Sequence, residues 1–123
     1  MIITLPLPPS KNEIKIPVRG RLIHTTKYNK YKKMVYPIIV EQLVHNPEMR
    51  YIYGQPMFKP TLEVQLELKI KVYLKDKRRD ATNIIEPLLD VLKGYLYDDD
   101  KYILVNMEEI KLDPHNPRVE VIV

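Results

Sequence analysis

The stretch LEVQLELKIKVYL, residues 62–74, decides the fold of this chain. Along it, apolar side chains alternate strictly with polar ones or tyrosine: Leu62, Val64, Leu66, Leu68, Ile70, Val72 and Leu74 are the apolar members. Because successive side chains of a strand point to opposite faces, a period of two predicts a long strand with one buried face. Its far end delivers the chain to the charged run KDKRRD, residues 75–80. Side chains at the end of such a rigid element are held in precise positions.

Upstream of this strand, the sequence predicts a strand, a hairpin and a helix. Residues 2–7 indicate a short strand that stops at two consecutive prolines, since proline cannot donate to a ladder. Residues 14–23, with Pro17 and Gly20, indicate a loose basic hairpin. A helix is expected from Thr25 or Thr26 to about residue 44, kinked or interrupted at Pro37.

One stripe of that helix is expected to face the core. It contains Tyr31, Met34, Val35, Ile38 and either Gln42 or Leu43. Tyrosines at helical spacing are more often core residues, but Tyr28 and Tyr31 also have rings that can stack on nucleobases. The sequence leaves both roles open.

Downstream of the strand, a second helix is expected over about residues 83–92, and Gly94 ends it. Pro87 requires that this helix begin only a few residues earlier or kink. Strands follow at 103–112, with an irregularity at residues 108–109, and at 119–123. This order predicts an α+β fold: one domain, residues 1–123, with a mixed sheet covered by two helices.

Composition places the chain among globular proteins. It is 45% apolar and 29% charged, which excludes a disordered chain, and it has no cysteine, which excludes disulfides and thiolate metal sites. No apolar run approaches the ~20 residues of a membrane span. The first residues lack the pattern of a secretory signal. We therefore expect a cytoplasmic protein with no membrane partner.

Charge is unevenly distributed along the chain. The net charge is +4, and residues 11–33 hold eight lysines or arginines against one acid, Glu13. Acidic residues come later, above all in the run Asp98, Asp99 and Asp100. This asymmetry indicates an anionic partner, nucleic acid first. The alternative is an ordinary solvated helix face and a charged surface hairpin.

Carboxylates at both ends of one helix-sized segment suggest a metal site. Asp80 precedes the second helix, directly after Lys77, Arg78 and Arg79, and the acidic run 98–100 follows it. Mg²⁺ takes oxygen ligands, usually one or two carboxylates together with phosphate oxygens and water. Basic side chains beside such an ion would hold a phosphate backbone.

These residues carry a family resemblance. The segments LPLPPSKN, residues 5–12, and KRRDATNIIEPLLDVLKGYLYDDDKYI, residues 77–103, resemble the RusA family of Holliday-junction resolvases. That family has a Pro-Pro-Ser-x-Asn turn, then basic-basic-Asp-x-Asp-Asn, an apolar helix, and Asp-Asp before a strand. The order of elements matches over nearly the whole chain.

The resemblance implies a homodimer that binds four-way junction DNA and makes paired nicks. The implied cofactor is Mg²⁺, and Mn²⁺ can take its place. The implied catalytic residues are Asp80 and Asp100, with Asp99, and Glu86 is a further candidate from this chain's own sequence; the implied metal ligands are Asp80, Asp100 and Asp99. Phosphate contacts are expected from Lys77, Arg78, Arg79, Asn83, Arg19, Arg21, Lys27 and Lys30.

Two residues depart from the family pattern. Thr82 stands where the family has its middle aspartate, and Glu86 stands where it usually has lysine. Positions four apart are neighbours on a helix face, so Glu86 is a candidate replacement for the missing acid. The alternative is a catalytically impaired junction- or DNA-binding protein on the same fold. A basic adaptor for a protein partner is a third hypothesis, but it leaves the acidic cluster unexplained.

Overall fold

The central strand β4 (Leu66–Leu74) forms where apolar and polar residues alternate. The computed structural model describes residues 1–48 and 50–123. Leu68, Ile70 and Val72 are fully buried on one face of the strand. The strand begins four residues later than the sequence pattern predicted, because Thr61 closes a turn: its N–H donates to the Val64 carbonyl (2.9 Å) and its hydroxyl accepts from the Val64 N–H (3.0 Å). Val64 is therefore 73% exposed.

The sheet is mixed and has the strand order β1-β6-β4-β5. β1 (Ile2–Leu5) pairs antiparallel with β6 (Arg118–Ile122), and β6 pairs antiparallel with β4. β5 (Ile103–Leu112) runs parallel to β4 along the sheet edge. Its register with β4 shifts between Met107 and Glu109, so the irregularity predicted at residues 108–109 is confirmed.

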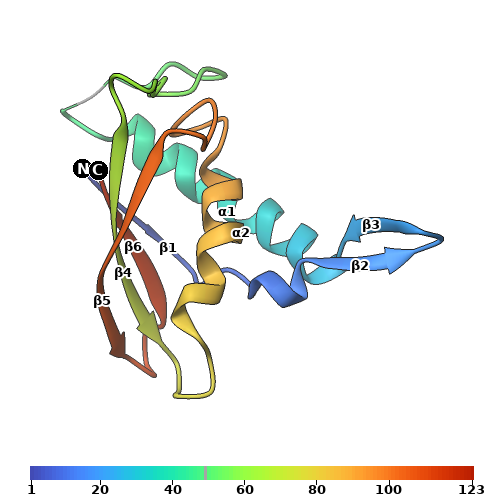
Figure 1. The fold of residues 1–123 in the computed structure, drawn as a ribbon. Coiled ribbons are helices and arrows are strands. Elements are labelled where there is room, and N and C mark those ends of the chain that lie inside the picture. Colours follow the sequence, from blue (N-terminus) through green and yellow to red (C-terminus); the bar gives the residue numbers. More distant parts are fainter. Residues whose placement is uncertain (49) are drawn as a thin grey trace.

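The two helices pack on the same face of this sheet (Figure 1). α1 (Thr26–Val44) is capped by Thr25, whose hydroxyl accepts from the Tyr28 N–H at 3.2 Å. It continues through Pro37 without interruption. Together with the mixed sheet, this arrangement confirms the predicted α+β class.

The buried stripe of α1 differs from the predicted one. It consists of Tyr28, Tyr31, Val35, Ile39 and Leu43. The stripe is rotated relative to the prediction, so Met34 is about half exposed and Ile39 replaces Ile38 at the centre. Because both tyrosine rings lie in the core, the hypothesis that they stack on nucleobases is wrong.

The second helix begins with a short 3₁₀ turn, η2 (Ala81–Ile84), and continues as α2 (Ile85–Leu92). Pro87 is the third residue of α2, where a backbone N–H would have no partner within the helix, so its ring is tolerated. The expectation that the helix begins only shortly before Pro87 is confirmed. Gly94, at φ 89°, follows the end of the helix.

A two-stranded hairpin projects from the domain (Figure 1). After the 3₁₀ turn η1 (Lys11–Glu13), β2 (Lys15–Val18) pairs with β3 (Arg21–His24). The two-residue turn between them has positive φ at both Arg19 (50°) and Gly20 (74°), as tight hairpins require. The hairpin predicted over residues 14–23 is confirmed, and almost all of it is exposed.

The buried and exposed parts of the alternating stretch 62–74 should contribute differently to the free energy of unfolding. Val72→Ala should lower the free energy of unfolding by about 2–3 kcal/mol, because it removes buried methyl groups and leaves a cavity. Val64→Ala, the matched control, should change it by less than about 0.5 kcal/mol. Urea denaturation followed by circular dichroism measures both. Equal losses would mean that the buried strand begins before Leu66.

Candidate functional site

Asp80 caps the 3₁₀ turn that leads into α2. Its Oδ1 accepts from both the backbone N–H of Thr82 (3.0 Å) and the Thr82 hydroxyl (2.8 Å). The hydrogen bond from the hydroxyl, followed by that from the N–H, lowers the pKa of the Asp80 carboxyl, and the charge of Lys11 adds to this effect. Thr82, which stands where the resemblance places an acid, therefore favours the ionised form of Asp80 and orients its carboxylate.

The Asp80 carboxylate lies in a cavity of about 300 Å³, which we call the Asp80 cavity. Its lining comes from η1, the loop after β4 and η2: Ser10, Glu13, Asp76, Arg78, Arg79, Asp80 and Asn83. Arg78 is 92% exposed along its side chain, with its Nε 3.8 Å from an Asp76 oxygen. Arg79 is half-buried and donates from Nη2 to the Pro8 carbonyl. One arginine is thus free to move and the other is anchored.

A second cavity, of about 150 Å³, gathers carboxylates from two segments. We call it the acid cavity; Ile14, Lys15, His24, Glu86, Asp90 and Asp100 line it. Glu86 and Asp90 lie one turn apart on α2, and Asp100 comes from the loop before β5. Glu86 and Asp100 are among the site residues predicted from the sequence, whereas Asp90 is not. The spacing of four between Glu86 and Asp90 was the available sign that both share a face.

Buried tyrosines fix the acid cavity to α1. The Tyr28 hydroxyl donates to Asp90 Oδ2 at 2.5 Å, and burial, followed by this carboxylate, raises the pKa of Tyr28. His24 packs edge-on against the Tyr28 ring with ring centroids 5.0 Å apart, and its Nδ1 lies 2.7 Å from the Lys32 ammonium. Because an ammonium can only donate, Nδ1 is the acceptor. The sequence showed no metal-ligand spacing around this histidine, and only the fold brings it to the cavity.

The acidic run 98–100 is divided in its roles. Asp98 Oδ1 accepts from the Asp99 N–H (2.8 Å), and Asp99 Oδ1 accepts from the Lys101 N–H (3.3 Å). Both carboxylates therefore shape the turn, whereas that of Asp100 lines the acid cavity. The choice of Asp100 as the principal acid of the run stays a prediction.

The donor chemistry of the acid cavity fits a hard divalent cation. Carboxylate oxygens from Glu86 and Asp100 match the one or two that Mg²⁺ takes from a protein, with water and phosphate completing its shell. Within residues 1–48 and 50–123, no three His, Cys, Asp or Glu side chains are grouped closely enough to hold a metal ion by themselves. Asp80 lies in the Asp80 cavity and not in the acid cavity. The two cavities meet at neighbouring residues of the chain, since Glu13 lines the first and Ile14 lines the second. A site shared by Asp80 and Asp100 stays a prediction.

The basic residues predicted to contact DNA occupy three places. Arg19 and Arg21 are exposed at the hairpin tip, and Lys77 is exposed in the loop after β4. Lys27 and Lys30, on the first turns of α1, line a cavity of about 260 Å³ together with Arg79. The Lys27 ammonium is paired with Glu13. Asn83 is half-buried in the Asp80 cavity.

Comparison with protein-family models gives a match over most of the chain. The sequence model of the family described as endodeoxyribonuclease RusA matches residues 6–123, nearly the whole chain. A search of curated proteins found no match. No helix in the part of the chain that the structure describes is long and apolar enough to cross a membrane.

Removing the Thr82 hydroxyl should raise the pKa of Asp80. Thr82→Val keeps the side-chain shape but removes the larger of the two hydrogen bonds that favour the ionised carboxylate. Carboxyl ¹³C chemical shifts of Asp80 followed through a pH titration should therefore show a higher midpoint in the variant. Thr82→Ser, which keeps a hydroxyl, is the control and should leave the midpoint low. An unchanged midpoint in Thr82→Val would show that the hydroxyl does not act on Asp80.

Proposed function

Because this chain belongs to the RusA endodeoxyribonuclease family, we propose that it resolves four-way (Holliday) DNA junctions by Mg²⁺-dependent phosphodiester hydrolysis. The proposal includes paired, symmetric nicks made by a homodimer. Its main support within the molecule is the acid cavity, where Glu86, Asp90 and Asp100 converge beside the basic hairpin. A carboxylate cavity next to a basic surface suits a substrate whose phosphates must be both held and cut.

In this proposal Glu86 and Asp100 would hold the cation, Mg²⁺ or Mn²⁺, which when bound would act as a Lewis acid toward the phosphodiester and activate water. The Tyr28 hydroxyl donates to Asp90 and holds it in place. This hydrogen bond also fixes the face of α2 that carries Glu86. Asp80, ionised and fixed by Thr82, is the third proposed carboxylate, contributed from the neighbouring cavity. Asp99 supports the turn that presents Asp100.

The location of Glu86 supports the hypothesis that it replaces the acid missing at Thr82. Glu86 lies with Asp100 in one cavity, while the Thr82 hydroxyl is engaged by Asp80. The two departures from the family pattern would then compensate each other in charge at the site. Lysine at position 86 would instead bring an ammonium to the cavity that Asp90 and Asp100 line.

Phosphate contacts are proposed for basic side chains of the hairpin and of the loop after β4. Arg78 can reach a phosphate with both edges of its guanidinium, because its side chain is 92% exposed and its ion pair with Asp76 spans 3.8 Å. Arg79 is fixed by the Pro8 carbonyl and would act as a positioned charge. Arg19 and Arg21 would extend the contact along the backbone, giving affinity that depends on salt rather than sequence.

Dimerisation is proposed from exposed apolar surface. The edge strand β5 leaves Val105, Ile110 and Leu112 exposed, and the hairpin leaves Leu22 and Ile16 exposed. A long edge strand with apolar side chains is a surface that proteins normally cover. A two-fold enzyme also suits a junction with two equivalent strands to cut.

A second candidate is a protein that binds junctions without cutting them. It is favoured by one observation: among the described residues, no three potential ligands are gathered into a ready metal site. On this account the carboxylates would be too dispersed to activate water, and the basic surface would still bind DNA.

A labelled four-way junction tests the proposal. The protein should nick it only when Mg²⁺ or Mn²⁺ is present. Asp100→Asn and Glu86→Gln should each lower the cleavage rate at least about tenfold, because each removes one proposed metal ligand. Both variants should still shift the junction on a native gel, since less negative charge lies near the phosphates.

Glu63→Gln is the matched control, because Glu63 is an exposed acid in the turn before β4. It should cut at the wild-type rate. A shift without any cleavage by the wild-type protein would favour the second candidate, and the absence of both would reject DNA as the partner.

A further inference from the structure

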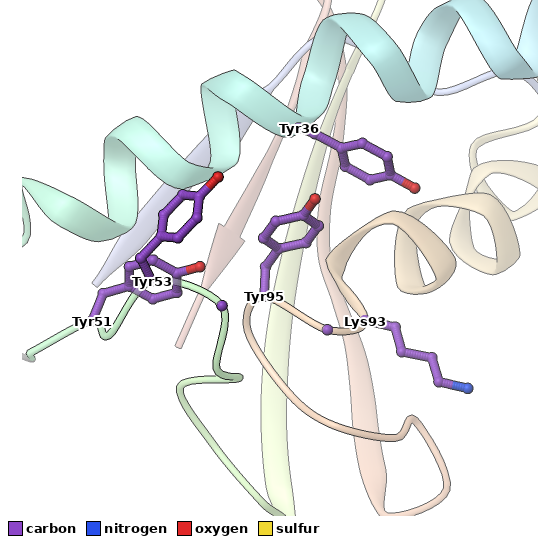
Figure 2. A pocket seen from close by; sticks show the side chains of 7 residues that line it. Tyr36, Tyr51, Tyr53, Lys93 and Tyr95 are labelled. Carbon is purple, nitrogen blue, oxygen red and sulfur yellow. The ribbon is translucent and has the colours of Figure 1, made fainter.

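A tyrosine-rich cavity of about 470 Å³ lies between the end of α2 and the loop before β4 (Figure 2). Tyr36, Tyr51, Tyr53 and Tyr95 line it together with Lys93, Gly54 and Gly94. Four of the nine tyrosines of the chain are thus gathered in one place. Its volume falls within the range of about 300–1,000 Å³ that is usual for ligand sites.

Backbone hydrogen bonds hold the two walls of this tyrosine cavity together. The Met57 N–H donates to the Tyr95 carbonyl (2.9 Å), and the Phe58 N–H donates to the Leu96 carbonyl (2.8 Å). On the other wall, Tyr36 of α1 packs against Tyr95 with ring centroids 5.1 Å apart and ring planes inclined by 33°. The loop that carries Tyr51 and Tyr53 is therefore fixed against the segment after α2.

Tyr53 is presented to solvent by a tight turn. The Gln55 N–H donates to the Ile52 carbonyl at 3.0 Å, and Gly54 has a φ of 82°, which places Tyr53 at the second position of the turn. The residue is 82% exposed. An exposed aromatic ring gains little of the free energy that burial provides, so Tyr53 adds little to the stability of the fold. Figure 2 shows its ring on the side of the cavity opposite Tyr95.

We propose that the tyrosine cavity binds an unpaired nucleobase of the DNA substrate, stacked on Tyr53 and its neighbouring rings, with the adjoining phosphate near Lys93. This inference rests on the proposed function, because it takes DNA as the partner. Every base has an aromatic face, so stacking on tyrosine binds single strands without regard to sequence. Figure 2 shows the Lys93 side chain leading away from the tyrosine rings, so its ammonium would meet the phosphate that adjoins the bound nucleotide and not the base itself.

The position of the cavity links it to the acid cavity. Lys93 follows Asp90 by three residues at the end of α2. Asp90 lines the acid cavity and Lys93 lines the tyrosine cavity, so about one helical turn of the chain separates the two cavities. A strand whose phosphodiester enters the acid cavity can therefore place a neighbouring base, unstacked at the junction centre, in the tyrosine cavity.

Binding of a fluorescein-labelled oligothymidine, measured by anisotropy without divalent cations, tests the inference. Tyr53→Ala should weaken binding roughly tenfold or more, the range expected for loss of one base–aromatic stack. Tyr53→Phe keeps the ring and should bind as the wild type does. Ile52→Ala, the control for the loop, changes an exposed neighbour that does not line the cavity and should also bind normally. Lys93→Gln should reduce the salt dependence of binding by about one phosphate contact.

The same variants are then assayed for junction cleavage, which separates this inference from the proposed function. If oligothymidine binding depends on Tyr53 but the protein cuts no junction, nucleobase binding in the tyrosine cavity is supported and the proposed nuclease activity is rejected. Junction cleavage with unchanged oligothymidine binding in Tyr53→Ala would reject the cavity and keep the nuclease. A labelled proline-rich peptide is measured alongside; peptide binding that depends on Tyr53, with oligothymidine binding that does not, would reject the nucleobase as occupant. If the wild-type protein bound neither the oligothymidine nor the four-way junction, both the nucleobase site and the proposed nuclease would be rejected.

Discussion

The burial of one face of β4 is the constraint on which the rest of the fold depends. Leu68, Ile70 and Val72 are completely shielded from water, and each contributes about 1.5–3 kcal/mol by leaving it. That burial requires a layer of helices on one side of the strand, which α1 and α2 provide (Figure 1). Because β4 also pairs with both β5 and β6, its position fixes the whole mixed sheet.

The candidate site follows from how the chain leaves and returns to this strand. After β4, the loop turns back through Asp80 into α2, and the chain then passes the acidic run to enter β5 in parallel. A parallel return places the start of β5 beside the start of β4, so α2 must span the sheet between them. Tyr28 then ties α1 to α2 through Asp90, which brings the hairpin and its His24 to the acidic face of α2. Packing of the core thus determines which charges meet.

Local patterns predicted the elements of the fold well, and non-local contacts limited the prediction of the site. The period of two in β4 was sufficient to predict the strand. The same period also includes Val64, but a turn at Thr61 precedes the strand there and leaves the Val64 side chain exposed. The role of Asp90 depends on a tyrosine 62 residues away in the sequence, which no local pattern reveals. The tyrosine cavity likewise joins α1, a connecting loop and the end of α2.

The central claim is that folding has built a cation site from Glu86 and Asp100 on a DNA-binding domain. Crystals grown with Mn²⁺ and measured for anomalous scattering test it most directly, because the map locates the ion without relying on activity. The account predicts a peak in the acid cavity, within coordinating distance of both carboxylates, that disappears in Glu86→Gln and Asp100→Asn crystals. A peak only beside Asp80, or none in the acid cavity, would contradict it.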